Sequence, residues 1–185
     1  KCSNTYLYVS WGIFTYHISF IMDILKDQAY EKELNKTRFK AIPAVFAVIE
    51  KDGCILLGKR ADTGYMAGKY GLVSGHVDGG EPLKQAMIRE IEEEVGLIVK
   101  AEDLDFVHIS HRVSEEKDGT ERMDFFFYIK DWVGEPAIME KDKCTHLDWF
   151  SYDTLPEETI LYIKNILKRI QEGKNYTEDG WNYEK

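Results

Sequence analysis

The chain has 185 residues, of which 44% are hydrophobic and 31% charged, as expected for one globular domain with or without an appendage. These values exclude a wholly disordered or collagen-like chain. With 24 Lys and Arg against 33 Asp and Glu, the net charge is −9, so the chain lacks the basic character typical of a nucleic-acid-binding protein. Three widely spaced cysteines, Cys2, Cys54 and Cys144, fit neither a disulfide framework nor a zinc site. They favour a reducing, cytoplasmic setting.

The first 40 residues differ in composition from the rest and predict an N-terminal extension, residues 1–40. From Cys2 to Met22 there is no Asp, Glu, Lys or Arg, and 13 of these 21 residues are apolar. A spanning helix needs about 20 mostly apolar residues, so three interpretations stay open. They are a membrane anchor, which is not the favoured one, an extra strand or hairpin packed on the domain, and residues that precede a start at Met22. The charged residues 23–40 predict a short amphipathic helix.

The main domain is predicted at residues 41–172, followed by a polar and aromatic tail, residues 173–185. A turn at Asp52 and Gly53 joins the first two strands into a hairpin, and an exposed turn is expected at 115–120. In chain order the predicted strands are 42–49, 54–60, 70–77, 106–113, 123–129 and 146–152, and the predicted helices are 82–95 and 157–172. This mixture predicts an α+β fold, an α/β/α sandwich.

An acidic stretch stands near the end of the first predicted helix of this domain. Glu90, Glu93 and Glu94 are spaced i, i+3, i+4 and therefore share one helical face. Like charges so placed destabilise a bare helix, whereas a hard cation such as Mg²⁺ or Mn²⁺ prefers carboxylate oxygens. A solvated acidic face is the alternative. Arg89 is placed to brace one carboxylate, and Gly96 is expected to end the helix.

The segment from Gly75 to Leu97 carries the most specific signal. It fits the pattern G-x5-E-x7-R-E-U-x-E-E-x-G-U, where U is apolar, at every fixed position. This is the Nudix box, and the chain resembles Nudix hydrolases over about residues 42–170. The resemblance implies the Nudix fold, with a mixed central sheet and the box as loop–helix–loop. It also implies metal-dependent hydrolysis of a nucleoside diphosphate linked to another group.

The same resemblance assigns roles residue by residue. Glu81 matches the upstream glutamate that supports metal-bound water, and Arg89 matches the arginine that orients a glutamate. Glu140 matches a loop glutamate that acts as general base or extra metal ligand, with a solvated loop acid as the alternative. Glu94 is the other expected base. The positions that match Mg²⁺ or Mn²⁺ ligands are Gly75, through its carbonyl oxygen, Glu90, Glu93 and Glu94.

Residues 56–77 and 132–150 resemble the MutT-type branch of the family. That branch implies a nucleoside triphosphate as substrate, with a nucleoside monophosphate and pyrophosphate as products. Two departures are visible: Ser74 replaces a glycine, and Glu158 and Thr159 stand where enzymes selective for oxidised guanine can present an asparagine. A nucleotide sugar or dinucleotide hydrolase and a non-catalytic nucleotide sensor are the alternatives.

Substrate contacts are predicted from charge and aromaticity. Lys59 and Arg60 are expected to contact phosphate oxygens, although an exposed strand-end pair is an equal alternative. Phe46 and Phe127 are the aromatic residues chosen to bind a planar group. The wider set of aromatic candidates also contains Tyr65, Tyr70, Phe125 and Trp149. For each of these residues, a position in the core is the alternative. The expected partner is a small-molecule nucleotide and not nucleic acid, with a homodimer left open.

Overall fold

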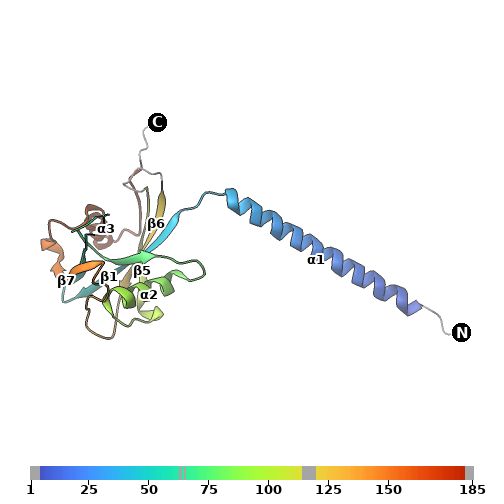
Figure 1. Cartoon of the computed structure of the whole chain (residues 1–185), viewed down its shortest axis with the longest axis horizontal. Helices are drawn as coiled ribbons and strands as arrows, with labels where there is room; N and C mark the ends of the chain where they lie inside the picture. Colours follow the sequence, from blue (N-terminus) through green and yellow to red (C-terminus); the bar gives the residue numbers. More distant parts are fainter. Residues whose placement is uncertain (1–4, 63, 65, 114–119, 182–185) are drawn as a thin grey trace. The chain divides into compact units, whose positions relative to one another are not determined.

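The computed structural model describes residues 5–62, 64, 66–113 and 120–181, with side chains from residue 21 onward. The chain divides into two compact units, Lys1–Lys40 and Ala41–Lys185. In the first, α1 is one continuous helix, Thr5–Thr37 (Figure 1). Of the three open interpretations, the extra strand or hairpin is therefore wrong. No proline interrupts the helical run. In the described part of the chain, no helix has both the length and the apolar character to span a bilayer.

The second unit is built on a mixed sheet around β1, Ile42–Lys51. β1 runs parallel to β6, Glu121–Ile129, with Phe46 opposite Phe126, and antiparallel to β4. The strand order is β3-β2-β1-β6-β5-β8, with β4 paired to β1 and β7 paired to β2. The remaining strands are β2 Cys54–Arg60, β3 Tyr70–Gly71, β4 Val73–His76, β5 Leu104–Val113, β7 Cys144–Ser151 and β8 Tyr176–Asp179.

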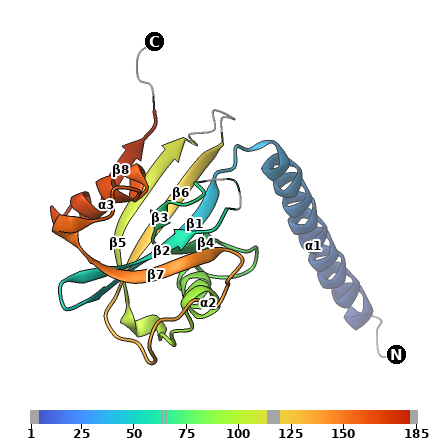
Figure 2. The ribbon, with the colours of Figure 1, turned by 60° about the vertical axis from the view of Figure 1, so that its left-hand side comes forward.

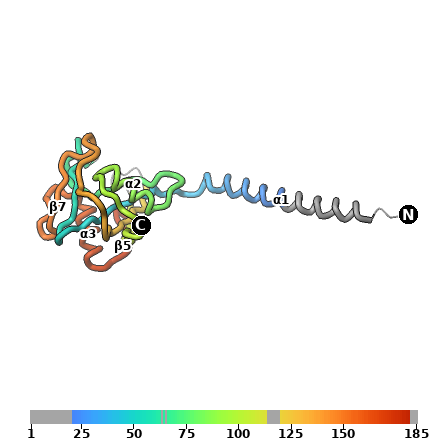
Figure 3. Tube along the Cα trace, turned by 90° about the horizontal axis from the view of Figure 1, so that it is seen from below, coloured from blue at the N-terminus to red at the C-terminus, as the bar shows by residue number. Residues whose placement is uncertain are grey.

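Two helices cover opposite faces of this sheet (Figure 2). Residues 44–49 of β1 are all buried, so alternate side chains enter two separate cores. Val45, Ala47 and Ile49 pack with helix α2, Leu83–Val95. Ala44, Phe46 and Val48 pack instead with helix α3, Leu161–Gln171. The predicted α/β/α sandwich is confirmed, and the trace of the domain can be followed in Figure 3.

The hairpin between β1 and β2 has the predicted turn. Asp52 and Gly53 both have positive φ, 54° and 75°, as a two-residue hairpin turn requires. The strand expected at 70–77 is instead divided at Leu72 into β3 and β4. The two pieces serve different neighbours, because β3 pairs with β2 whereas β4 pairs with β1.

Two predicted boundaries at the end of the chain need correction. α3 begins at Leu161 and not at residue 157, because Thr159 forms a parallel β-bridge with Tyr70 and keeps the preceding backbone extended. The sheet also continues past residue 172, since β8 pairs with β5 and Asp179 accepts a hydrogen bond from Ser110. The expected turn at 115–120 lies outside the described residues except for Thr120.

Two 3₁₀ turns complete the list of elements. These are η1, Ala101–Asp103, and η2, Tyr152–Thr154. η1 leads directly into β5, and η2 directly follows β7. Both therefore act as connections at the ends of the sheet.

Candidate active site

Helix α2 carries the acidic face of the box along the sheet. Ile91 and Val95 are buried against the core, which directs the neighbouring positions Glu90 and Glu94 toward one cavity. Gly96 ends the helix with a φ of 69°, and its N–H donates to the carbonyl of Glu92 at 3.0 Å. The carboxylates are therefore carried by a helix that is packed on the core and has a defined C-terminal end.

Arg89 binds several of the box carboxylates at once. Its guanidinium donates to Glu81 Oε1 at 2.7 Å and to Glu90 Oε1 at 2.6 Å, and it lies 3.5 Å from Glu93 Oε2. It also donates to the carbonyl oxygen of His76 at 3.1 Å. The hydrogen bond from Arg89 holds the pKa of Glu81 below its ordinary value. Arg89 thus braces these carboxylates, as its position in the box predicts.

Gly75 passes directly beneath the carboxylate of Glu90. A Cβ atom at Gly75 would lie 2.0 Å from Glu90 Cδ, closer than any real contact. Residue 75 must therefore be glycine if Glu90 is to keep this position. β4 carries Gly75 opposite Val45, so the close approach is set by the pairing of β4 with β1.

Glu94 is the most perturbed carboxyl group of the site. Burial raises its pKa to about 7, and the negative charges of Glu90 and Glu140 act in the same direction. A hydrogen bond from the backbone N–H of Ser74, 3.2 Å from Glu94 Oε2, partly opposes this increase. Without a bound cation, burial therefore shifts Glu94 toward its protonated form.

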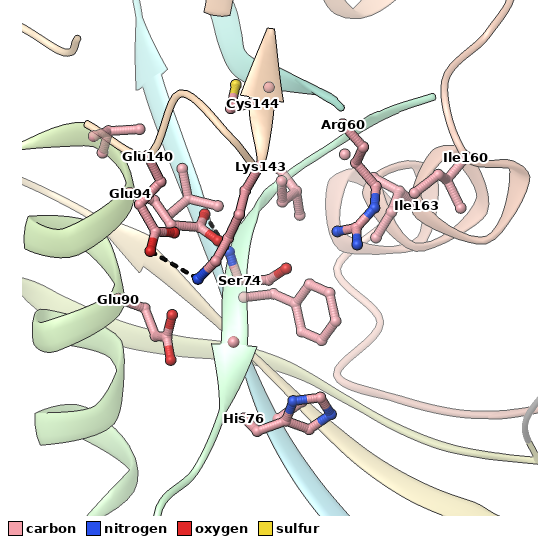
Figure 4. Close-up of a pocket in the computed structure, with 18 of the residues that line it drawn as sticks. Arg60, Ser74, His76, Glu90, Glu94, Glu140, Lys143, Cys144, Ile160 and Ile163 are labelled. Carbon is pink, nitrogen blue, oxygen red and sulfur yellow. Dashed lines mark hydrogen bonds and ion pairs between the residues drawn. The ribbon is translucent and has the colours of Figure 1, made fainter. Parts of the chain in front are cut away.

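Glu140 comes from the loop that precedes β7 and lies on the same side of the cavity as Glu90 and Glu94 (Figure 4). The Lys143 ammonium donates to Glu140 Oε1 at 2.7 Å. This hydrogen bond raises the pKa of Lys143 above its ordinary value. The positive charge of Lys143 also lowers the pKa of Glu94, so this lysine lies close enough to influence both acids.

The cavity has a volume of about 880 Å³, which is large enough for a nucleotide. Besides Gly75, Glu90 and Glu94, four of the predicted residues line it: Phe46, Lys59, Arg60 and Glu140. Figure 4 shows Arg60 across the cavity from Glu90 and Glu94. Lys59 also lies over the ring of Tyr70, 5.4 Å from its centroid.

Phe127 does not belong to this cavity, and its predicted substrate contact needs correction. Phe127 is 3% exposed and lies in the core beneath α2, whereas Phe46 faces α3. The aromatic neighbour of Phe46 is instead Phe126, with ring centroids 4.7 Å apart. Of the wider set, Phe125 and Trp149 pack on the α2 core, Tyr70 packs on the α3 core, and Tyr65 lies outside the described residues.

The cavity also contains residues that the sequence did not single out. Arg112 of β5 and Arg122 of β6 line it, together with His76 of β4 and Tyr162 of α3. Buried Asp124 accepts a hydrogen bond from Arg112 Nε at 2.6 Å. The available signal was the spacing of polar residues at alternate positions: His108, Ser110 and Arg112 in β5, and Arg122 and Asp124 in β6.

The carboxylates of the cavity suit a hydrated divalent cation better than a fully enclosed one. Among the described residues, no three His, Cys, Asp or Glu side chains converge closely enough to enclose one ion. Mg²⁺, however, usually keeps several waters and uses one or two carboxylates together with substrate phosphates. Glu90 and Glu94 share the cavity with Gly75 and fit that requirement. Glu93 points outward, with 53% of its side chain exposed, and lies near Arg89.

Comparison with known proteins identifies the family. Residues 40–170 match the family model described as the NUDIX domain. An ADP-ribose pyrophosphatase of Methanocaldococcus jannaschii is 32% identical over 147 residues, which cover 78% of this chain and 83% of that protein. The nucleoside triphosphatase NudI of Salmonella newport is 31% identical over 129 residues, which cover 68% of this chain and 89% of NudI.

Solved structures give the same result. A MutT NUDIX hydrolase from Burkholderia pseudomallei is 30% identical, with a TM-score of 0.64 over 70% of this chain and 98% of that one. The solution structure of the E. coli ORF135 protein is 25% identical, with a TM-score of 0.61 over 72% of this chain and 91% of the other. The chain belongs to the Nudix hydrolase family, and MutT-type proteins are among its structural neighbours.

Proposed function

We propose that the chain hydrolyses a phosphoanhydride bond of a nucleoside triphosphate and releases a nucleoside monophosphate and pyrophosphate, with Mg²⁺ or Mn²⁺ as cofactor. The observation that supports this most is the sharing of one cavity by Glu90 and Glu94 of α2 and cationic side chains of the sheet. Carboxylates suit a hard cation, and guanidinium groups suit phosphate oxygens. The opposite charges therefore match a metal–nucleotide complex.

Each box residue has a proposed task. Glu90, Glu94 and the carbonyl oxygen of Gly75 would hold the cation, with Glu93 as a further ligand at the outer edge of the helix face. When bound, the cation would polarise a phosphoryl oxygen and lower the pKa of water. Arg89 orients Glu90 through its 2.6 Å contact, and it holds Glu81, which would help to position the attacking water.

The remaining tasks belong to the loop and the sheet. Glu140 or Glu94 takes the proton from the attacking water, since both line the cavity. Lys59 and Arg60 contact phosphate oxygens, and Phe46 contributes an apolar surface for a planar group. This division leaves catalysis to the carboxylate side and substrate binding to the sheet side.

A second candidate substrate is ADP-ribose. The observation that favours it is the 32% identity with the Methanocaldococcus jannaschii ADP-ribose pyrophosphatase. The same carboxylates would act on a diphosphate that links two nucleosides or a nucleoside and a sugar. A non-catalytic sensor is less well supported, because the chain retains all three helix glutamates of the box.

Partner and location follow from the same reasoning. The proposed partner is a small-molecule nucleotide and not nucleic acid, and a homodimer remains an option. The proposed cytoplasmic location rests on the cysteines: Cys54 and Cys144, the two in the described part of the chain, are free thiols.

A product-resolved hydrolysis screen tests the proposal. The substrates would be canonical and oxidised nucleoside triphosphates, ADP-ribose, nucleotide sugars and dinucleotides, each with Mg²⁺, with Mn²⁺ and with chelator. We expect pyrophosphate and one nucleoside monophosphate from a triphosphate, no product in chelator, and recovery when metal is returned. If only ADP-ribose is hydrolysed, the proposed triphosphate substrate is wrong, but the proposed hydrolysis of a phosphoanhydride bond still holds. Turnover that persists in chelator would refute the metal-dependent mechanism.

A further inference from the structure

Two arginines on adjacent strands of the sheet form a pair that lines the cavity. In the antiparallel pairing of β5 with β6, Arg112 is directly opposite Arg122, and Ser110 is directly opposite Asp124. Like charges directly opposite one another destabilise a strand pair. Both arginines nevertheless have little exposure, with 10% and 18% of their side chains accessible. The two opposed guanidinium groups therefore destabilise this strand pair, and the backbone pairing of the sheet does not account for their presence.

Asp124 accepts a hydrogen bond from each of the two arginines. Its carboxylate is fully buried and accepts from Arg112 Nε at 2.6 Å and from Arg122 Nε at 3.4 Å. The hydroxyl of Tyr162 donates to the same carboxylate at 3.0 Å, and the Arg112 guanidinium lies 4.6 Å from the centre of the Tyr162 ring. Because buried ion pairs are often no more stabilising than apolar residues, we interpret this unit as a means of fixing the two guanidinium groups.

The unit faces the cavity described above. Arg112, Arg122 and Tyr162 all line it, and Phe46 lines it beside them. Arg122 Nη1 also lies 3.1 Å from His76 Nε2 on β4, so a third element positions this arginine. The cationic residues come from the sheet, whereas Glu90 and Glu94 come from α2. A nucleotide that spans the cavity would reach both.

Resting on the proposed function, we infer that the Arg112–Asp124–Arg122 unit selects the substrate by binding its hydrogen-bond acceptor atoms. A guanidinium group only donates hydrogen bonds. It therefore matches the O6 and N7 acceptors of guanine, whereas adenine presents an amino donor at the corresponding position. A distal phosphate offers the same acceptor chemistry. The base edge is the favoured source, because Lys59 and Arg60 of β2 also line the cavity and are the proposed phosphate contacts.

Equilibrium binding of two nucleotides that differ only in the base tests this inference without requiring turnover. Calorimetric titration with GMP and AMP would compare the full-length chain with Arg122→Lys, which keeps the charge but loses the planar fork. Arg169→Lys is the matched control, because Arg169 forms a 2.7 Å ion pair with Asp179 but does not line the cavity. Melting temperatures would verify that each variant is folded.

We expect the wild-type chain to bind GMP about tenfold more tightly than AMP, in line with the discrimination that a two-hydrogen-bond arginine contact provides. Arg122→Lys should remove that preference, and Arg169→Lys should retain it. Equal weakening of GMP and AMP in Arg122→Lys, with inorganic phosphate competing, would support the shared acceptor chemistry with phosphate as its source. Binding of both nucleotides unchanged within twofold in Arg122→Lys would overturn the inference.

Two further comparisons keep the test decisive. If Arg122→Lys does not fold, Tyr162→Phe removes one hydrogen bond to Asp124 and should reduce the GMP preference about threefold. An unchanged preference there would overturn the inference. Binding of GMP that depends on Arg122 in a protein without hydrolytic activity would refute the proposed function but support the selectivity. Normal hydrolysis with nucleotide binding independent of Arg122 would support the proposed function but refute the selectivity.

Discussion

The two sides of the cavity are assembled in different ways. The carboxylate side depends on one helix, in which Glu90 and Glu94 are one turn apart and on one face. The sheet side depends on the register between β5 and β6, which sets Arg112 opposite Arg122 and lets Asp124 accept a hydrogen bond from each. The comparison teaches that the carboxylate side can be predicted from a local motif, whereas the arginine side requires contacts that only the tertiary fold creates.

The largest expected effect separates catalysis from the rest of the acidic helix. Glu94→Gln should lower kcat at least a hundredfold, because it removes a cation ligand or the base itself. Glu92→Gln is the matched control, since Glu92 is an exposed acid of the same helix that does not line the cavity. Steady-state kinetics with a circular dichroism check would measure both. Near-normal turnover in Glu94→Gln would contradict the role of this residue.

The close approach of Gly75 to Glu90 gives the next effect. Gly75→Ala should lower kcat/KM about tenfold or more, since the added methyl group must displace the Glu90 carboxylate. The free energy of unfolding should change little, because the atoms that must move are the far end of the flexible Glu90 side chain. Gly79→Ala is the control, because no atom lies within 4 Å of a Cβ at that position. Equal activity of the two variants would show that Glu90 does not need its present position.

Burial of Glu94 predicts an unusual pH dependence of stability. Its pKa is about 7 in the folded state and 4.5 in a fully hydrated one. Between these values the unfolded chain releases a proton that the folded chain retains, so stability contributed by the protonated group declines as pH rises through this window. In chelator, Glu94→Gln should be more stable than wild type by on the order of 2 kcal/mol at pH 8. Urea titrations at pH 5 and pH 8 would measure this, and an advantage equal at both pH values would contradict the assignment.

The smallest expected effect concerns the lysine between the loop and the helix. Lys143→Gln should raise the pKa of Glu94 further, because the positive charge that lowers it is removed. The midpoint of the pH-dependent stability change should then move upward by a few tenths of a pH unit, as expected for an exposed charge. Lys141→Gln, an exposed lysine of the same loop outside the cavity lining, should leave the midpoint in place.

Local patterns account for most of what the sequence predicts correctly. The helix with its Gly96 end, the Asp52-Gly53 turn and the contacts of Arg89 all depend on residues near one another in the chain. Their geometry follows from helical periodicity, turn chemistry and charge. The fold class follows from the same elements together with the family motif.

Strand register accounts for most of what the sequence does not predict. Phe127 and Phe126 are neighbours, yet only Phe126 lies on the same face of the sheet as Phe46, because side chains alternate along a strand. The pairing of Arg112 with Arg122 depends on the register of β5 and β6. The β-bridge that fixes Thr159 and the late start of α3 likewise joins segments far apart in the chain.

Binding of Mn²⁺ measured by electron paramagnetic resonance tests the central claim, that Glu90 and Glu94 hold the catalytic cation, most directly. The titration would compare wild type, Glu94→Gln and Glu92→Gln without nucleotide and with a non-hydrolysable nucleoside triphosphate analogue. We predict that Glu94→Gln weakens binding at least tenfold while Glu92→Gln leaves it unchanged. Equal Mn²⁺ affinity in all three proteins, with and without nucleotide, would contradict the claim.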